Sequence, residues 1–319
     1  MNALRPLLRD IAFRSGALSL ARSRLRHALT VVMLHRVIDP ADPDFAASDP
    51  TYTLSVPLFE RLLDFLCDHY AVVSLRDVMN ASDGARSLPD HAVLITFDDG
   101  WADNLRYAAP LLRARGLPAV VFAVPDAILS PSDGWWQEQV FAAGRSGRLP
   151  GGTSPLDLVA RLAPMDADER TRILATVPVQ PCHARMMLTP EEVPLLAEYG
   201  IDVGLHGYSH APLTMVVDVE LELTRAKQAL AMLSGGTATT TALGCPHGRY
   251  DERVIAGTHA AGMKLVFTSD PILNLTHDGT LIPPRPLGRI NVEARRIADG
   301  SRRFDPAAAA RWLWARDCR

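Results

Sequence analysis

Short apolar runs rich in β-branched residues alternate along the chain with segments whose apolar residues recur at helical spacing. Such runs predict buried strands, because a strand covered on both faces carries apolar side chains at successive positions. The predicted strands span residues 29–37, 71–75, 91–97, 117–124, 201–205, 237–246, 263–269 and 287–292. The helical spacing predicts helices over residues 55–70, 103–116, 189–200, 217–233 and 251–262.

Two of these helices carry clear capping signals. Ser55 can cap the helix at 55–70, with Pro57 in its first turn. Thr189 and Glu192 form a capping box at the start of 189–200, and Gly200 is placed to end that segment. We therefore expect a helix over each of these two stretches.

Strands that alternate with helices predict an α/β fold with a mostly parallel sheet and helical crossovers. About seven such units favour a barrel of parallel strands over an open sheet. The pattern weakens between about residues 130 and 186, where loops and short helices predict a helical insertion. We expect an N-terminal segment at 1–28, the barrel domain at 29–295 and a C-terminal tail or helix at 296–319.

The composition suits one large α/β domain and argues against several other classes of protein. The chain has 319 residues, of which 48% are apolar and 22% charged, so it can bury a sizeable core. The net charge of −3 argues against a nucleic-acid partner. The four cysteines form no CxxC pair, which indicates neither a disulfide framework nor a thiolate zinc site and fits a reducing compartment.

The N-terminal segment is basic and amphipathic. It carries six arginines against one aspartate up to Arg26, and charged residues at 9, 10 and 14 interrupt the place of an uncharged signal-peptide core. No apolar run approaches the roughly 20 residues that span a bilayer. We expect a cytoplasmic protein whose N-terminal segment either rests on the inner face of the membrane or docks on the domain as a solvated helix.

Polar residues follow several of the predicted strands. Asp98 and Asp99 come directly after the strand at 91–97, and His206 follows 201–205. Because the carboxyl ends of parallel strands meet at one rim, we expect these side chains to converge there. His206 and His210 are four residues apart, a spacing that keeps both on one face of a helix or an extended segment.

Two imidazoles and one carboxylate make a three-ligand set with open positions, the arrangement of catalytic zinc sites. The second aspartate would then act as general base on a water activated by the cation. The cation would also offset the repulsion between the adjacent carboxylates. The same ligand types suit non-haem iron oxygenases, but those usually have a double-stranded β-helix rather than alternating strands and helices.

Three segments resemble the first three motifs of the polysaccharide deacetylases, the NodB-homology or carbohydrate esterase family 4 proteins. They read ITFDDGWADN at 95–104, VGLHGYSHAPL at 203–213 and GCPHGRYDERV at 244–254. The resemblance extends from about residue 29 to 292. It implies a distorted, incomplete (β/α) barrel and a metal-dependent hydrolase that removes N- or O-acetyl groups from glycans.

The resemblance implies a role for each matching residue. Asp98 corresponds to the general base, and Asp99, His206 and His210 correspond to the ligands of a divalent metal, usually zinc. The backbone N–H of His247 falls where the third motif supplies an oxyanion donor, a kind of contact worth about 2.7–4 kcal/mol.

Three glycine or histidine positions depart from the family pattern. Gly207 replaces a Ser or Thr that helps to hold the metal loop, so the geometry there is expected to be looser. His247 replaces the usual aromatic residue. Gly244 stands where many members carry an arginine that orients the base.

Four further residues are candidates for catalysis or substrate binding. The family's late Leu-x-His motif, which supplies the general acid, is matched locally by His277 in a predicted loop. His35, at the end of the first strand, is a second catalytic candidate, or else a histidine that packs the barrel mouth. Trp101 could stack on a sugar ring. Arg289 could hold substrate or form a structural ion pair.

The function that we expect is metal-dependent deacetylation of an acetylated saccharide or lipid-linked saccharide, with an Asp general base. In terms of reaction class, this is a hydrolase acting on non-peptide carbon–nitrogen bonds. The alternative is a catalytically impaired family member that binds glycan or metal without turnover.

Overall fold

The computed structural model describes residues 22–23, 25–129, 135–149, 152–163, 165, 167–177, 186–281 and 286–318. The predicted N-terminal segment at 1–28 therefore lies almost wholly outside the described residues, as does part of the predicted insertion. Within the described ranges, no helix combines the length and apolar character that a membrane span requires.

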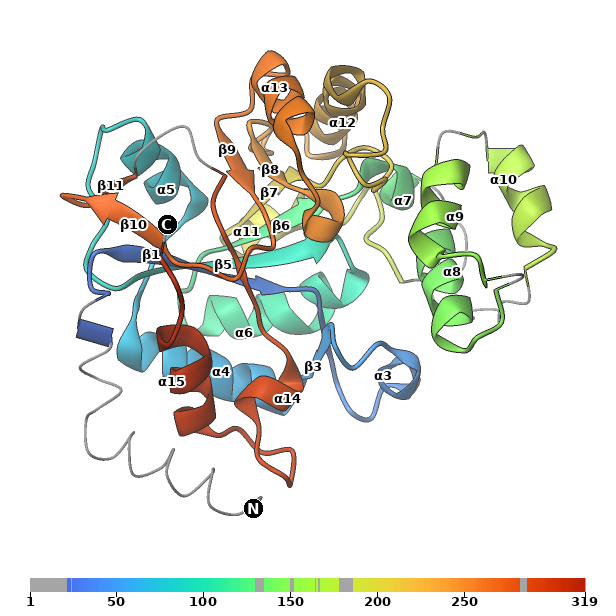
Figure 1. Cartoon of the computed structure of the whole chain (residues 1–319). Helices are drawn as coiled ribbons and strands as arrows, with labels where there is room; N and C mark the ends of the chain where they lie inside the picture. Colours follow the sequence, from blue (N-terminus) through green and yellow to red (C-terminus); the bar gives the residue numbers. More distant parts are fainter. Residues whose placement is uncertain are drawn as a thin grey trace.

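A ten-stranded sheet forms the centre of the described part of the chain (Figure 1). Its parallel strands are β1 (Ala28–Leu34), β4 (Ala71–Val72), β5 (Ala92–Asp99), β6 (Ala119–Ala123), β7 (Ile201–Leu205), β8 (Ala242–Gly244), β9 (Leu265–Phe267) and β12 (Ile290–Asn291). Seven of them follow in the order β12-β1-β5-β6-β7-β8-β9, with β4 beside the start of β5.

The sheet curls back on itself, and among the described residues a single bridge joins its two ends there. That bridge links Phe267 at the end of β9 to Leu287, shortly before β12. Leu287 N–H also donates to Val266 O at 2.7 Å, and Thr268 N–H donates to Leu287 O at 2.8 Å. This arrangement confirms the predicted distorted, incomplete barrel of about seven parallel strands.

Alternate residues of β5 face two different cores, as the pleat of a strand requires. Ile95 and Phe97 pack in a cluster with the helices, whereas Leu94 belongs to a second cluster with Phe122 and Phe267. The rings of Phe122 and Phe267 lie 5.3 Å apart although β6 and β9 are not neighbours in the sheet. Their contact therefore crosses the inside of the curl and fixes its radius.

Most of the predicted helices are present. They are α4 (Val56–His69), α6 (Ala109–Ala114), α12 (Val219–Leu233) and α13 (Glu252–Ala260), accompanied by α3 (Pro43–Ala47), α5 (Leu75–Ser82), α14 (Ala294–Ile297) and α15 (Pro306–Trp314). The Ser55 side chain caps α4, as predicted, by accepting from Leu58 N–H at 3.4 Å. A π-helical turn, η1 (Asn104–Ala108), precedes α6.

The prediction of a helix over 189–200 is wrong in extent. Glu192 Oε2 does accept from Thr189 N–H at 3.0 Å, but the α-helix α11 covers only Leu195–Glu198. Pro194 has no N–H, so the α-helical hydrogen bond that this residue would donate cannot form. Gly200, with φ of +74°, ends the segment as predicted.

The prediction of a loop around His277 is also wrong. The chain forms a hairpin of β10 (Asn274–His277) and β11 (Thr280–Leu281), and β10 pairs antiparallel with β1 at the edge of the sheet. Asp278 and Gly279 join the two strands with φ of +51° and +77°. Two consecutive positive φ values favour an Asp-Gly pair and a tight two-residue turn.

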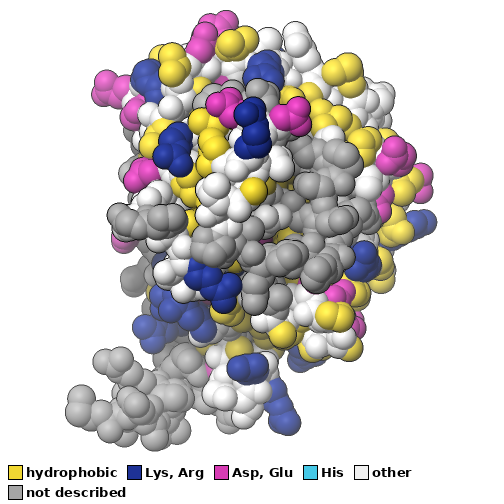
Figure 2. All heavy atoms as spheres, turned by 90° about the vertical axis from the view of Figure 1, so that its right-hand side faces the viewer, with side chains coloured by type: hydrophobic (Ala, Val, Ile, Leu, Met, Phe, Trp, Pro, Cys, Tyr) yellow, Lys and Arg dark blue, Asp and Glu magenta, His cyan; other side chains and the backbone are white. Residues whose placement is uncertain are grey.

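The helices after β6 lie to one side of the barrel (Figure 1). They are α7 (Pro125–Leu129), α8 (Trp136–Arg145), α9 (Pro155–Leu162) and α10 (Ala167–Leu174), and they share a separate apolar cluster. Trp135 in this cluster contacts Trp101 of the barrel edge to face, with centroids 5.5 Å apart. Figure 2 views this side, where basic, acidic and apolar side chains are mixed on the described surface.

Candidate metal and catalytic site

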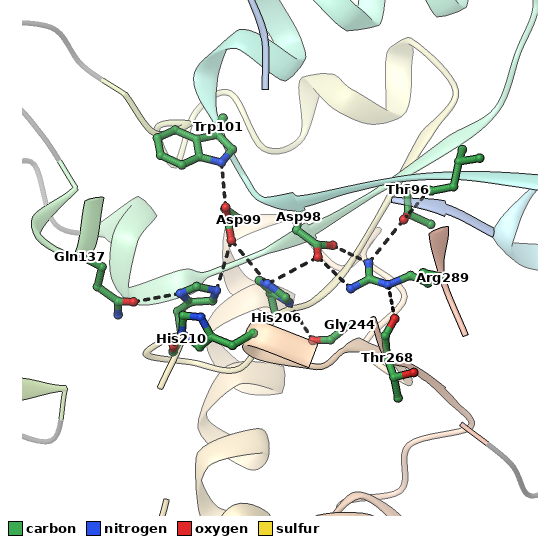
Figure 3. Close-up of polar contacts among 12 residues, drawn as sticks. Thr96, Asp98, Asp99, Trp101, Gln137, His206, His210, Gly244, Thr268 and Arg289 are labelled. Atoms are coloured by element: carbon green, nitrogen blue, oxygen red, sulfur yellow. Dashed lines mark hydrogen bonds and ion pairs between the residues drawn. The ribbon is translucent and has the colours of Figure 1, made fainter. Parts of the chain in front are cut away.

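The carboxyl ends of three parallel strands of the same sheet, β5, β7 and β8, bring the predicted polar residues together. Asp98 and Asp99 are the last two residues of β5, and His206 directly follows β7. His210 lies in the loop after β7, and His247 lies in a 3-10 turn, η3 (Pro246–Gly248), after β8. Figure 3 shows Asp98, Asp99, His206 and His210 pointing toward one another.

Asp99, His206 and His210 are spaced as the ligands of one ion. Asp99 Oδ1 lies 3.4 Å from His206 Nε2 and 3.3 Å from His210 Nε2, and all three residues are buried. Ligands about 2.0–2.1 Å from a tetrahedral zinc ion lie about 3.3 Å apart. The donor set therefore fits a divalent cation of the zinc type.

Hydrogen bonds fix both histidines in the form that a ligand needs. His206 Nδ1 lies 2.7 Å from Gly244 O, and His210 Nδ1 lies 2.9 Å from the side-chain oxygen of Gln137. Gln137 Nε2 donates to Ser209 O at 2.6 Å, which orients that amide. Because both acceptors are oxygens, each Nδ1 carries the hydrogen and each Nε2 presents a lone pair.

The charges around the set attract a cation. Burial lowers the pKa of His206, but the carboxylates of Asp98 and Asp99 outweigh burial and raise it overall. Burial raises the pKa of Asp99, yet His206 and His210 outweigh it and hold that pKa far below its usual range. Asp99 is therefore ionised, and its carboxylate can serve as an oxygen ligand.

The loop that carries the two histidines is held by a residue that sequence reasoning missed. Glu222 of α12 accepts from the N–H groups of Tyr208 and Ser209, at 3.0 and 2.8 Å, and from Ser209 Oγ at 2.8 Å. Gly207 adopts φ of +69°, a conformation that favours glycine. Glu222 thus anchors the loop at the two residues that follow Gly207.

Arg289 is buried against the predicted base, Asp98, and does not line the cavity. Its Nη1 and Nη2 donate to the two oxygens of Asp98 at 2.6 and 2.8 Å, and its Nε donates to Thr268 O at 2.9 Å. The side chain is 0% exposed, so of the two roles left open for Arg289 the structure shows the ion pair and not the substrate contact. This arginine, just before β12, supplies the guanidinium that the third motif lacks at Gly244.

The ion pair keeps Asp98 ionised in spite of its burial. Burial raises the pKa of this carboxyl, but Arg289 and then His206 outweigh burial and lower the pKa below its usual range. Asp98 Oδ2 lies 3.8 Å from His206 Nε2, beside the ligand set. Asp98 thus borders the candidate cation site and is not one of its three ligand residues.

Trp101 orients a candidate metal ligand, Asp99, and is not a free platform for a sugar. Its Nε1 donates to Asp99 Oδ2 at 2.9 Å, and the side chain is 3% exposed. The guanidinium of Arg36 lies 4.4 Å from the ring centroid, so one partner already lies over the ring. The predicted stacking role is therefore corrected to a hydrogen bond that fixes Asp99.

The tentative acid, His277, and the second catalytic candidate, His35, have very different places. His35 lines the cavity, with its ring 4.5 Å from that of Tyr52, and its buried Nδ1 has no hydrogen-bond partner among the described residues. The His277 side chain is 79% exposed on the outer hairpin and pairs with Asp278 at 3.2 Å. The structure therefore does not bring His277 to the site, which corrects its tentative assignment.

His247 lies against the ligand loop. Its Nε2 donates to His210 O at 3.1 Å, and the two rings have centroids 4.3 Å apart. Burial, followed by the charge of His206, lowers the pKa of His247 to about 4. The imidazole is therefore neutral at pH 7, and its backbone N–H lies in the first turn of η3, where such groups have no acceptor within the turn.

A cavity of about 270 Å³ opens in front of the ligand set. The strand ends form one wall, and Glu138, Phe141 and Arg145 of α8 form another. Sequence reasoning assigned no role to Gln137, although it is a polar residue beside Trp136 on the buried face of α8. A buried amide on an apolar helix face was the available signal for a residue that supports the site.

Comparisons with known proteins identify the family and the fold. The polysaccharide deacetylase family model matches residues 85–266, more than half of the chain. A search of curated proteins returned no match.

Several solved structures share the fold. The Streptococcus pyogenes deacetylase PplD in complex with acetate aligns with a TM-score of 0.60 and 16% identity, over 90% of this chain and 98% of that one. IcaB from Ammonifex degensii gives 0.58 and 19%, over 90% and 97%. A de-N-acetylase from Aggregatibacter actinomycetemcomitans gives 0.55 and 18%, over 82% and 95%.

Proposed function

Because the chain belongs to the polysaccharide deacetylase family, hydrolases of carbon–nitrogen bonds, we propose that it removes N-acetyl groups from a saccharide by metal-dependent hydrolysis. One observation carries the proposal: a convergent Asp-His-His set beside a buried carboxylate held by a buried guanidinium. A purely structural ion pair would not need three further ligand atoms within 4.8 Å of one another.

Asp99, His206 and His210 would hold the divalent cation, for which zinc is the best fit to these donors. When bound, the cation supplies the positive charge that polarises the acetyl carbonyl and makes a water acidic near neutral pH. Gln137, Gly244 and Trp101 keep the three ligands aimed at one point through their hydrogen bonds. This support reduces the reorganisation that ligand binding would otherwise require.

Asp98 acts as general base. Its two oxygens are fixed by Arg289, and it is ionised, so it can accept the proton of the water whose oxygen bonds to the acetyl carbon. The backbone N–H of His247 is assigned to the oxyanion that forms from the carbonyl.

The departing amine needs a proton when the carbon–nitrogen bond breaks. Asp98 has gained one from the water. The adjacent Arg289 stabilises the ionised form of Asp98 and so favours release of that proton. Burial lowers the pKa of His35, which is therefore neutral at the start of the reaction. We assign to Asp98 the transfer of this proton to the departing amine. We assign to His35 a hydrogen bond toward the substrate, since the Nδ1 of His35 has no partner among the described residues.

The experiment is a screen of N-acetylated and O-acetylated saccharides, free and lipid-linked, with detection of released acetate. Purified full-length protein is assayed with zinc, with a chelator and as Asp98→Asn. We expect zinc-dependent acetate release that the chelator abolishes reversibly. Stoichiometric metal binding without acetate from any substrate would instead indicate a family member that has lost turnover.

A further inference from the structure

Four arginines surround a second hollow, separate from the catalytic cavity. It has a volume of about 430 Å³ and lies between α14 and α15. Its charged and aromatic lining consists of Arg295, Arg296, Arg311, Arg316 and Trp312. None of these residues lines the catalytic cavity, and the proposed mechanism does not use them.

Two of the guanidiniums are held on the same aromatic ring. The guanidinium carbon of Arg296 lies 4.4 Å from the centroid of the Trp312 ring, and that of Arg316 lies 3.6 Å from it. Trp312 is itself fixed, because its Nε1 donates to Asn291 O at 3.0 Å. Cation–π attraction therefore keeps two mutually repelling cations in place.

The hollow contains more guanidinium groups than nearby carboxylates that could neutralise them. Glu293 pairs with Arg295 and, at 3.8 Å, with Arg296, while Asp317 acts on Arg316. Burial and then the charge of Arg296 lower the pKa of Arg316. Within the described residues, two carboxylates face four guanidiniums, so the hollow retains a surplus of positive charge.

One donor in the hollow has no acceptor. Nη2 of Arg316 is buried and makes no hydrogen bond to any described residue, although the Nε of the same side chain donates to Trp312 O at 2.7 Å. A buried donor left without an acceptor costs about 1–3 kcal/mol, and more for a charged group. An anionic oxygen in the hollow would satisfy it.

We propose that this arginine hollow binds the phosphate group of a ligand. Guanidinium groups donate pairs of parallel hydrogen bonds to phosphate oxygens, and a phosphate offers more oxygens and more negative charge than a carboxylate. A soluble phosphate compound and a phospholipid headgroup share this chemistry. The experiment below distinguishes the two sources.

One wall of the hollow, α14, packs near β3 (Thr53–Ser55), and Thr53 lines the catalytic cavity. Glu293, which occupies the N-cap position of α14 and pairs with Arg295 and Arg296, is also one of the carboxylates that raise the pKa of Tyr52, after burial, Asp49 and Asp99. Tyr52 lines the catalytic cavity, and α14 lies beside β3 (Thr53–Ser55) in Figure 1. A saccharide that carries a phosphate could therefore occupy both sites; that extension rests on the proposed function, whereas phosphate binding does not.

Binding is measured with the full-length protein and without turnover. Pyrophosphate is titrated by calorimetry, and vesicles of phosphatidylglycerol or of phosphatidylcholine alone are tested by co-sedimentation. The test variant is Arg295→Ser/Arg311→Ser, because both side chains are at the surface. The control is Arg86→Ser/Arg161→Ser, which removes the same charge from exposed arginines outside the hollow.

We expect the test variant to weaken binding about tenfold or more and the control to leave it unchanged. Binding of pyrophosphate alone assigns a soluble phosphate compound, and additional binding to the phosphatidylglycerol vesicles assigns a headgroup. No binding of either probe, or equal losses in both double variants, would overturn the proposal. Equal melting temperatures of the variants and the parent protein show that the fold is retained, and Arg295→Lys/Arg311→Lys should recover part of the affinity.

Discussion

The two walls of the catalytic cavity are built on different principles. On the strand wall, the side chains of Asp98, Asp99 and His206 are buried and each is paired with a neighbour. On the helix wall, Arg145 is 37% exposed and joins Glu138 and Asp49 in ion pairs of 2.6 and 3.1 Å at the rim. The strand wall therefore holds the buried residues assigned to the reaction, and the helix wall holds partly exposed residues that can contact a ligand.

The difference shows which parts of the site can vary independently. The strand residues are held by sheet register, so a change in one displaces its partners. The rim residues of α8 contact solvent and can change without moving a strand. Gln137 is the exception, because it reaches from α8 to His210 on the other wall. The following predictions test this division, from the largest expected effect to the smallest.

Removing one metal ligand from the strand wall should abolish both zinc binding and acetate release. In His206→Ala, only Asp99 and His210 remain, which is one ligand short of the three-ligand set. We expect loss of stoichiometric zinc and of acetate release. Zinc should raise the free energy of unfolding of the parent protein by about 2.7 kcal/mol at a hundredfold excess over Kd.

The comparison that decides this prediction is the melting temperature with and without zinc. The parent protein should show a zinc-dependent increase, and His206→Ala should show none. His277→Ala serves as the matched control, since that histidine is exposed on the outer hairpin. An equal zinc response in the parent protein and His206→Ala would contradict the ligand assignment.

The Asp98→Asn variant should retain metal binding but lose most of its catalytic activity. The amide is nearly isosteric but cannot accept the proton of water, so kcat should fall by about 10²–10⁴-fold. Zinc content should stay near that of the parent protein, because Asp99, His206 and His210 are unchanged. Metal analysis and acetate release on the same sample separate the base from the ligands.

Asp103→Asn is the matched control for this variant. Asp103 forms a similar buried ion pair, with Arg36 at 2.8 Å, but is not part of the ligand set. Both substitutions leave a buried guanidinium unpaired and should destabilise the protein. A loss of kcat in Asp103→Asn as large as that in Asp98→Asn would show that stability, and not base catalysis, explains the effect.

Gln137→Leu should weaken metal binding without removing a ligand. His210 would lose the acceptor of its Nδ1–H, and loss of such a support typically costs about 10–100-fold in metal affinity. A competition titration against a zinc chelator measures the change. Gln139→Leu, on the same helix, is the control, and equal affinities in the two variants would rule out coupling between the walls.

Much of the strand wall could be predicted from the sequence, because it depends on local pattern and one topological rule. The apolar run of β5 ends at Asp98, and His206 follows the apolar run of β7. In a parallel sheet these ends meet at one rim, so convergence follows from strand prediction alone. The fold was predictable for the same reason.

The partners of those residues were not predictable, since they depend on contacts between distant segments. Arg289 is 191 positions from Asp98 in sequence and reaches it because β12 and β5 both flank β1. Gln137 reaches His210 only once α8 has packed on the barrel. By contrast, the Asp278–Gly279 turn was a local signal for the missed hairpin, and Pro194 was a local signal against a full helix at 189–200.

The smallest effect should come from the helix wall itself. Phe141 of α8 lines the cavity, and its ring centroid lies 5.7 Å from that of His247, so Phe141→Ala removes apolar contact with a bound sugar and leaves every strand residue in place. Such contact is made equally in the ground and transition states. KM should therefore rise by a factor of about three to ten while kcat stays within about twofold. Tyr199→Ala, a partly buried aromatic outside the cavity, should change neither constant. If Phe141→Ala instead lowered kcat as strongly as Asp98→Asn, the helix wall would take part in the chemistry and the division between the two walls would fail.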